Sequence, residues 1–182
     1  ANSPDGNMYL WGMSKGSWDD GTVPTCGHYL RWDLYKEAGY PEITGYDDGS
    51  LLDALEAMVA LEPETADGQK TYGMGAWFGA GQGWGEWVFT FGLAPQEGAN
   101  LIETTGRVLA VSTVDSTPLE NNQLTDPEGY FWRAVRFYNQ ANQRGLLDPD
   151  SFTMTSDLYE ENLKAGKYMF NCPGWMSANA NQ

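Results

Sequence analysis

The chain has 182 residues, of which 41% are hydrophobic, and this length and composition fit one domain with a sizeable core. Asp and Glu outnumber Lys and Arg by 25 to 10, and the resulting net charge of −15 repels phosphate backbones and argues against nucleic acid as a partner. No stretch approaches the ~20 apolar residues of a membrane-spanning helix, so we expect no direct membrane insertion.

The first half of the chain alternates between strand and helix patterns. Period-two alternation and aromatic runs indicate strands, whereas apolar residues at helical spacing indicate helices. Ser50 with Asp53 resembles a capping box at the start of one helix. The predicted elements are a strand at 8–13, a Gly/Asp-rich loop at 15–27, a strand at 28–32, a helix from Asp33 to Gly39, a helix from Ser50 to before Pro63 and a buried strand at 71–78.

The second half continues in the same way. One face of its long helix is predicted to hold Phe131, Ala134, Val135, Tyr138 and Ala141. The predicted elements are a helix at 84–91, a hairpin of 101–103 with 107–112, a loop at 113–125, a helix from Asp126 or Pro127 to Gly145, a connection at 146–152, a helix from Ser156 or Asp157 to Gly166, and a strand at 167–171. Such alternation predicts a single α/β domain over 1–182, not a β-sandwich.

The tryptophans are placed unusually. Of the eight, only Trp32 and Trp132 fall in helical patterns. Six lie beside glycines in predicted turns: Trp11, Trp18, Trp77, Trp84, Trp87 and Trp175. Flat amphipathic rings on tight loops suit stacking against a sugar or another flat, partly apolar ligand. The alternative is that these rings cap the ends of a core.

The two cysteines, Cys26 and Cys172, belong to no Cys-x-x-Cys pair or Cys/His cluster, so neither a metal nor another cofactor is expected. The residues alone leave open whether they form a disulfide or remain two buried thiols. The chain begins without Met, which suggests a processed or excised piece.

The closing stretch at 161–175, ENLKAGKYMFNCPGW, resembles the "short helix, Gly-Lys, apolar strand, Gly/Pro-Trp" signature of family 1 extracellular solute-binding proteins of ABC importers. This is the maltose-binding-protein-like family. Three further segments follow the order found in that family: the segment crossing from the first lobe at 6–10, a strand-to-helix element at 29–39 and a helix at 46–58.

The resemblance implies an α/β fold of the periplasmic-binding-protein-like type II, with a mixed sheet flanked by helices. The chain would be the second, C-terminal lobe of a two-lobe protein whose first lobe is absent. This lobe alone should therefore bind its ligand weakly. The family implies a small-molecule ligand, here a carbohydrate or oligosaccharide, and an ABC permease as partner of the parent protein. It also implies an extracellular or periplasmic location for a lipid-anchored, exported parent.

Carried over by position, the resemblance assigns site residues. Trp175 matches the aromatic that stacks on sugar, while Trp84, Glu86 and Trp87 fall near the start of a helix that faces the cleft. Trp18, Asp19 and Trp11 border that cleft. The strands that end in Cys26 and Cys172 lie in one sheet in the family, which favours a disulfide between them.

Other functions are weaker on the sequence. A glycoside hydrolase fragment would also use aromatic rings, but it needs two suitably spaced carboxylates, and 25 acidic residues make such a pair easy to find by chance. The only histidine, His28, lies in a predicted strand and is interpreted as structural, and no Gly-x-Ser-x-Gly elbow occurs. An isolated protein-interaction domain with exposed tryptophans remains the third alternative. We therefore expect a binding lobe that is not an enzyme.

Overall fold

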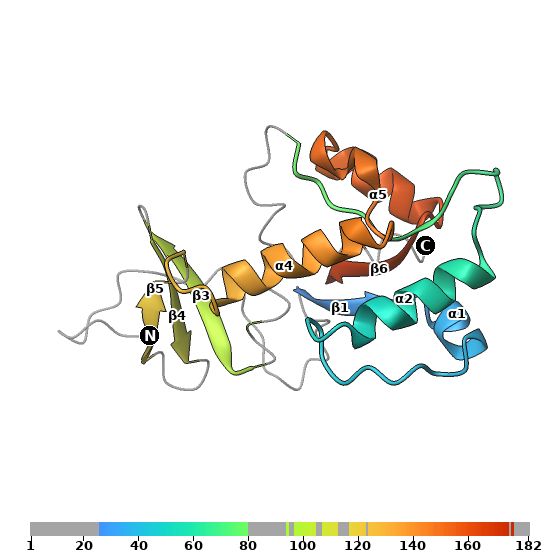
Figure 1. Ribbon diagram of the computed structural model, residues 1–182. Helices are drawn as coiled ribbons and strands as arrows, with labels where there is room; N and C mark the ends of the chain where they lie inside the picture. Colours follow the sequence, from blue (N-terminus) through green and yellow to red (C-terminus); the bar gives the residue numbers. More distant parts are fainter. Residues whose placement is uncertain are drawn as a thin grey trace, which may run out of the picture.

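The computed structural model describes residues 26–79, 94, 97–104, 107–112, 117–122, 124–174 and 176. Their elements include both strands and helices (Figure 1). In chain order they are β1 (Cys26–Leu30), α1 (Trp32–Glu37), α2 (Ser50–Leu61), β2 (Tyr72–Met74), β3 (Ala99–Thr104), β4 (Arg107–Ser112), β5 (Pro118–Asn122), α4 (Tyr130–Gln143), the 3-10 turn η3 (Pro149–Phe152), α5 (Ser156–Lys164) and β6 (Tyr168–Pro173).

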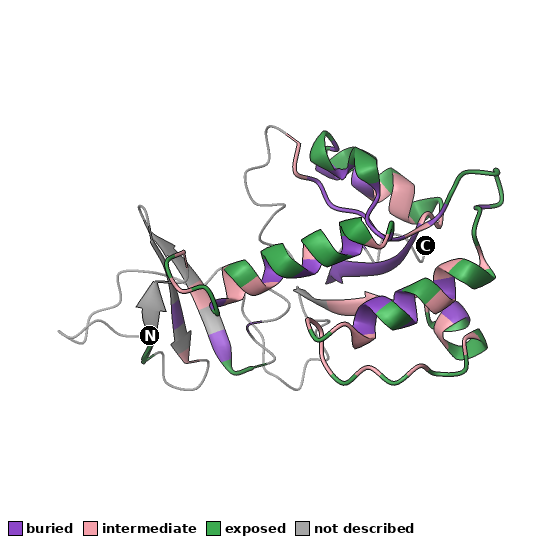
Figure 2. Ribbon diagram, viewed as in Figure 1, coloured by how far each residue is buried: buried purple, intermediate pink, exposed green. Residues whose placement is uncertain are grey.

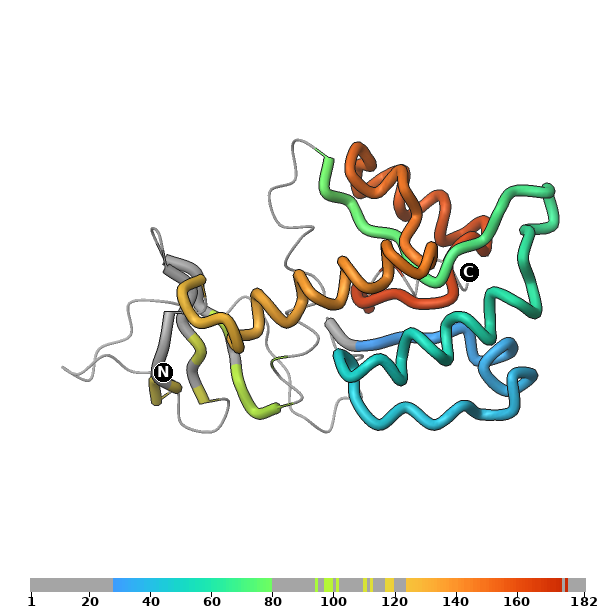
Figure 3. Tube along the Cα trace, in the orientation of Figure 1, coloured from blue at the N-terminus to red at the C-terminus, as the bar shows by residue number. Residues whose placement is uncertain are grey.

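A mixed three-stranded sheet in the order β1-β6-β2 forms the centre of the fold. The central strand β6 runs antiparallel to β1 and parallel to β2. β1 and β6 therefore lie side by side although they come from distant parts of the sequence (Figure 3). β6 is buried at every position, as a strand enclosed by neighbours should be (Figure 2). The expected α/β class with a mixed sheet and helices is confirmed.

The main hydrophobic core joins this sheet to the helices. α2 contributes Leu51, Leu52, Leu55 and Met58, α4 contributes Phe137 and Ala141, and α5 contributes Tyr159. Each set follows helical spacing, so one stripe of each helix faces the core. Phe170 of β6 meets Phe137 of α4 with ring centroids 6.4 Å apart.

A second sheet, β3-β4-β5, is wholly antiparallel and lies beyond the N-terminal end of α4 (Figure 1). The predicted hairpin corresponds to β3 and β4 and is confirmed. The predicted loop at 113–125 was wrong in part, because β5 lies within it. β5 has the sequence PLENN, and this polar composition does not predict a strand. The strand is held by backbone pairing to β4.

Three helix starts differ from the sequence expectation. Ser50 is the first residue of α2 and not its cap: the cap position is Gly49, and the Ser50 hydroxyl instead accepts hydrogen bonds from the Thr44 and Gly45 amides. α4 begins at Tyr130, because Asp126 accepts from the Glu128 amide in a turn ahead of the helix. α5 is capped by Thr155, whose hydroxyl accepts from the Leu158 amide, and not by Ser156 or Asp157.

The buried face of α4 also differs. Ala134 and Ala141 are buried as expected, but Val135 is 40% exposed and Phe137 is buried in its place. The spacing of Ala134, Phe137 and Ala141 is the i, i+3, i+7 pattern of one helical stripe, and Val135 lies to the side of it. The predicted strand at 71–78 is likewise shorter, since the sheet pairing of β2 covers only Tyr72–Met74.

Arg133 of α4 connects the loop before α2 to the segment before β3. The guanidinium of Arg133 in α4 makes two bonds to Asp47, of 2.6 and 3.1 Å, and two of 2.7 Å to Glu97. Asp47 precedes α2, whereas Glu97 precedes β3. The hydrogen bonds from Arg133 lower the pKa of both carboxyl groups. The two carboxylates therefore favour the folded state while they are ionised.

We predict that Arg133→Gln lowers the free energy of unfolding at pH 7 by about 1–2 kcal/mol, because two paired carboxylates lose their partner at a partly exposed site. Because both pKa values are lowered on folding, the contribution is present above the unfolded values of about 4 and is lost as pH falls through the folded values. The difference between variant and wild type should therefore stay constant above about pH 5 and narrow as the pH falls from about 5 toward 2, in urea unfolding followed by circular dichroism.

Arg136→Gln is the matched control for that experiment. Arg136 lies in the same helix, but its pair with Glu128 at 3.3 Å is solvent-exposed on both sides. Its loss should change the unfolding free energy by less than about 0.5 kcal/mol. Equal effects of the two substitutions would show that the Arg133 bonds contribute no special stability.

Candidate functional site

The strand directions of the mixed sheet define a single edge that we call the strand-end edge. β2 and β6 are parallel, with Tyr72 opposite Tyr168 and Met74 opposite Phe170, so both strands end there. β1 is antiparallel to β6, with Cys26 opposite Pro173, so the chain enters β1 at the same edge. In α/β sheets, ligands bind outside the carboxyl ends of parallel strands.

The predicted site residues come, in sequence, before or after the strands that begin or end at this edge. Trp84, Glu86 and Trp87 come after β2, Trp175 comes after β6, and Trp11, Trp18 and Asp19 come before β1. These seven residues lie outside the described part of the chain, so their side-chain positions stay predictions. What the structure describes is that the start of β1 and the ends of β2 and β6, which these segments precede or follow in sequence, meet at one end of the sheet.

The end of β6 is held by a buried hydrogen-bond chain. The Tyr159 hydroxyl of α5 donates to Asn171 Oδ1 at 2.7 Å, and Asn171 Nδ2 donates to the Pro173 carbonyl at 2.8 Å. Asn171 is only 3% exposed and Tyr159 only 1%. Sequence reasoning assigned no site role to either residue. A polar residue inside the otherwise apolar strand at 168–172 was the available signal.

The chain leaves β2 along a path that admits little side-chain volume. The Phe78 amide donates to the Ser151 carbonyl at 2.9 Å, and the Gly79 amide donates to the Met154 carbonyl at 3.0 Å. A Cβ atom at Gly79 would overlap the carbonyl oxygens of Thr153 and Met154. The glycine therefore permits a close backbone approach at the point where the chain enters the Gly/Trp-rich segment.

The described tryptophans reverse one part of the sequence expectation. Trp77, which is flanked by glycines in sequence, is only 2% exposed and packs on Tyr159 with ring centroids 4.7 Å apart. Trp32 and Trp132, both in helices, are 63% and 39% exposed. Trp77 therefore belongs to the core, which is the alternative that the sequence left open for it. For the described tryptophans, a neighbouring glycine in the sequence therefore did not indicate whether the ring is exposed or buried.

The two cysteines lie at the same end of one strand pair. Cys26 is opposite Pro173, the residue that follows Cys172, and Cys172 is buried. The pairing of the two cysteine-bearing strands therefore agrees with the arrangement that the resemblance implied. The Cys26 side chain lies outside the description, so the disulfide stays a prediction.

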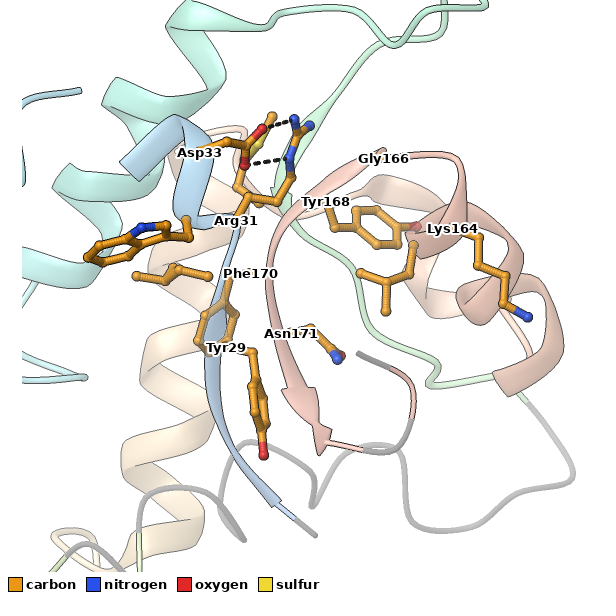
Figure 4. Close-up of a pocket in the computed structure, with 12 residues that line it drawn as sticks. Tyr29, Arg31, Asp33, Lys164, Gly166, Tyr168, Phe170 and Asn171 are labelled. Atoms are coloured by element: carbon orange, nitrogen blue, oxygen red, sulfur yellow. Dashed lines mark hydrogen bonds and ion pairs between the residues drawn. The ribbon is translucent and has the colours of Figure 1, made fainter. Parts of the chain in front are cut away.

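A cleft of about 510 Å³ lies along β1, β6 and the end of α5 (Figure 4). Its charged side chains are paired with one another or with neighbours: Arg31 bonds to Asp33 and Glu62, and Lys164 bonds to Glu160. The hydrogen bond from Arg31 lowers the pKa of Asp33. Figure 4 shows the Arg31–Asp33 pair at one end of the cleft and Tyr29 and Asn171 toward the other. Each of these charged side chains is therefore already paired with another side chain of the protein.

Asp148, the cap residue of η3, is 1% exposed. Its Oδ2 accepts from the Tyr168 hydroxyl and from Lys167 Nζ, both at 2.8 Å, and its Oδ1 accepts from the Asp150 amide at 3.0 Å. Burial raises the pKa of Tyr168, which keeps the phenol protonated as a donor. This cluster joins the start of β6 to η3 and is fully hydrogen-bonded within the fold.

In the part of the chain that the structure describes, no group of three or more His, Cys, Asp or Glu side chains is arranged to hold a metal ion. None of the helices described is both long and apolar enough to cross a membrane.

Comparisons of the chain with protein-family models, with curated proteins and with solved structures found no match.

We predict that Trp77→Ala lowers the free energy of unfolding by about 3–5 kcal/mol, because it leaves a cavity in the core beside Tyr159. Trp32→Ala should cost less than about 1 kcal/mol, since that ring is largely exposed and loses only contacts to Tyr35 and Tyr40. Urea unfolding followed by far-UV circular dichroism measures both values. Similar costs for the two substitutions would contradict the assignment of Trp77 to the core.

We also expect Cys26 and Cys172 to be bridged in protein prepared under oxidising conditions. Alkylation of the denatured, unreduced protein should then add no label, and alkylation after reduction should add two. Mass spectrometry distinguishes these outcomes, and two labels without reduction would show two thiols instead of a disulfide.

Proposed function

We propose that the chain is the second lobe of an ABC importer's extracellular solute-binding protein and forms one wall of a carbohydrate site. The observation that carries this proposal is the strand-end edge, where β1 begins and β2 and β6 end, because the three tryptophan-bearing segments precede or follow these strands in sequence. The ordered sequence resemblance supports it, and a mixed sheet flanked by helices agrees with the type II lobe which that resemblance implies.

The chemistry of these segments fits a neutral saccharide. Tryptophan rings stack on the apolar faces of sugar rings, and carboxylates such as Asp19 and Glu86 accept hydrogen bonds from hydroxyl groups. The net charge of −15 disfavours an anionic ligand. The lobe would perform no chemical step: its role is to bind and orient the sugar.

The proposal includes the rest of the importer. A first lobe would supply the opposite wall, and the closed pair of lobes would deliver the sugar to a membrane permease. The protein would act outside the cell or in the periplasm, attached to the membrane through a lipid on the parent chain. A single wall buries only part of the ligand, so we expect weak binding, roughly millimolar.

Titration with maltotriose, cellotriose and xylotriose tests the proposal, with tryptophan fluorescence as the readout. We predict a saturable change with at least one of the three sugars, and a loss of affinity of about three- to tenfold in Trp175→Ala, the size of one aromatic stacking contact. Trp32→Phe is the control, because α1 follows β1 at the end of the sheet opposite the strand-end edge. Its affinity should equal that of the wild type.

Two outcomes would overturn the proposal. If none of the three sugars binds at a concentration of roughly 20 mM, the carbohydrate function is contradicted. This concentration is about 20-fold above the expected dissociation constant. Release of shorter sugars during incubation, followed by chromatography, would replace the binding role with that of a glycoside hydrolase fragment.

A further inference from the structure

After β2 ends, the chain continues toward the strand-end edge. Residues 74–77 and 170–173 border the same small cavity, so the exit from β2 stays beside the last residues of β6. Figure 1 shows that the segment after β2 and the strand β6 run toward the same side of the molecule. Residues that lie beside this exit segment are therefore on the strand-end side of the fold.

η3 lies beside the exit segment. Ahead of η3, Leu147 forms a parallel bridge with Met74, the last residue of β2. Within η3, the Ser151 carbonyl accepts from the Phe78 amide at 2.9 Å. Because both segments advance in the same direction, η3 extends past the end of β2, as Phe78 does. By extended-chain length, Phe78 lies up to about 13 Å beyond Met74.

Phe152, the last residue of η3, presents a large exposed ring at this place. Its exposed fraction is 61%. The ring is supported by Phe78, with centroids 5.7 Å apart, and Phe78 meets Tyr138 of α4 edge to face, with centroids 5.2 Å apart. Phe152 therefore has a protein ring behind it and a broad apolar surface that a flat ligand can reach.

η3 is fixed by hydrogen bonds at its start and in its middle. At the start, Asp148 Oδ1 accepts from the Asp150 amide at 3.0 Å. In the middle, Ser151 is fully buried, and its hydroxyl accepts from the Ala76 amide at 3.0 Å. A ligand that stacks on Phe152 therefore loses little binding energy to ordering of the backbone below the ring.

The groups around the ring suit a neutral ligand that is rich in hydroxyl groups. Asp150 and Thr153 are close to Phe152 in sequence, and both are exposed. The carboxylate accepts hydrogen bonds from hydroxyl groups, and the threonine oxygen can accept them as well. An anionic ligand would meet both this carboxylate and the net charge of −15. The apolar face of a sugar ring, with hydroxyl groups at its rim, matches this combination.

We propose that Phe152 forms an outer stacking subsite, which binds a sugar unit of an oligosaccharide that extends beyond the strand-end edge. This inference rests on the proposed function and names the length of its ligand. The Phe152 ring lies past the strand ends, so the outer units of a long oligosaccharide reach it. Phe152 therefore favours long oligosaccharides over short ones.

Three variants isolate the stacking contact. Phe152→Leu keeps an apolar side chain but removes the flat ring, whereas Phe152→Tyr keeps the ring. Trp32→Ala is the matched control, because Trp32 is 63% exposed and also has a neighbouring ring, Tyr35, at 5.8 Å. It begins α1, which follows β1 at the end of the sheet opposite the strand-end edge.

The experiment measures the affinity of the full chain for maltotriose, cellotriose, xylotriose and the corresponding pentasaccharides by isothermal titration calorimetry. We expect at least one pentasaccharide to bind about three- to tenfold more tightly than its trisaccharide, the size of one further stacking contact. Phe152→Leu should remove this advantage and leave the affinity for the trisaccharide unchanged. Phe152→Tyr and Trp32→Ala should both keep it.

A second measurement detects the contact directly by ¹⁹F NMR of the chain labelled with 4-fluorophenylalanine. Phe152→Leu assigns the Phe152 resonance by its disappearance from the spectrum. The pentasaccharide should shift this resonance more than the trisaccharide does at equal saturation. Equal shifts with the two lengths would contradict an outer subsite.

The outcomes separate this inference from the proposed function. If wild type binds sugars and Phe152→Leu keeps the advantage of the pentasaccharide, the outer subsite is overturned and the proposed function stands. Equal losses in Phe152→Leu and Trp32→Ala overturn the subsite as well. A wild-type dimer that dissociates in Phe152→Leu, seen by analytical ultracentrifugation, would assign the ring to a contact between copies instead. If wild type binds sugars of neither length, the proposed function fails and the subsite fails with it.

Discussion

The position of β6 between two strands of opposite direction is the constraint on which the rest of the structure depends. Every residue of this strand is buried, and its backbone pairs with β1 on one side and with β2 on the other. A strand enclosed in this way cannot change its register without moving its apolar side chains out of the core. The register in turn determines which chain segments meet at each end of the sheet.

The two ends of β6 have different chemistry. At its start, the charged cluster of Asp148, Lys167 and Tyr168 connects the strand to η3, and all of its members bond to groups within the fold. At its far end, the neutral pair of Tyr159 and Asn171 holds a proline carbonyl. Neutral hydrogen bonds cost less to bury than charges, so this end of β6 is held at a lower desolvation cost than its start.

The second sheet adds a different kind of connection. Among the described side chains, Ala94, Ala99 and Ala110 are buried in its core, with Leu101 and Tyr130 packed against them. Tyr130 packs against both cores, and the four hydrogen bonds of Arg133 join the loop before α2 to the start of β3. α4 therefore connects the two sheets through one aromatic ring and one guanidinium group.

Local pattern determined most of the element types: the helical stripe of α2, the hairpin of β3 and β4, and the Gly-Lys boundary before β6 follow from spacing and turn residues. The sequence did not predict β5, whose polar residues carry no strand signal, or the burial of Phe137 in place of Val135, which depends on the rotation of α4 against β6. It did identify the segments before β1 and after β2 and β6 as candidates for a site. Only the tertiary structure decided that the start of β1 and the ends of β2 and β6 share one edge and that Asn171 bonds to both Tyr159 and Pro173, because strand pairing and buried hydrogen bonds depend on packing that the local pattern does not encode.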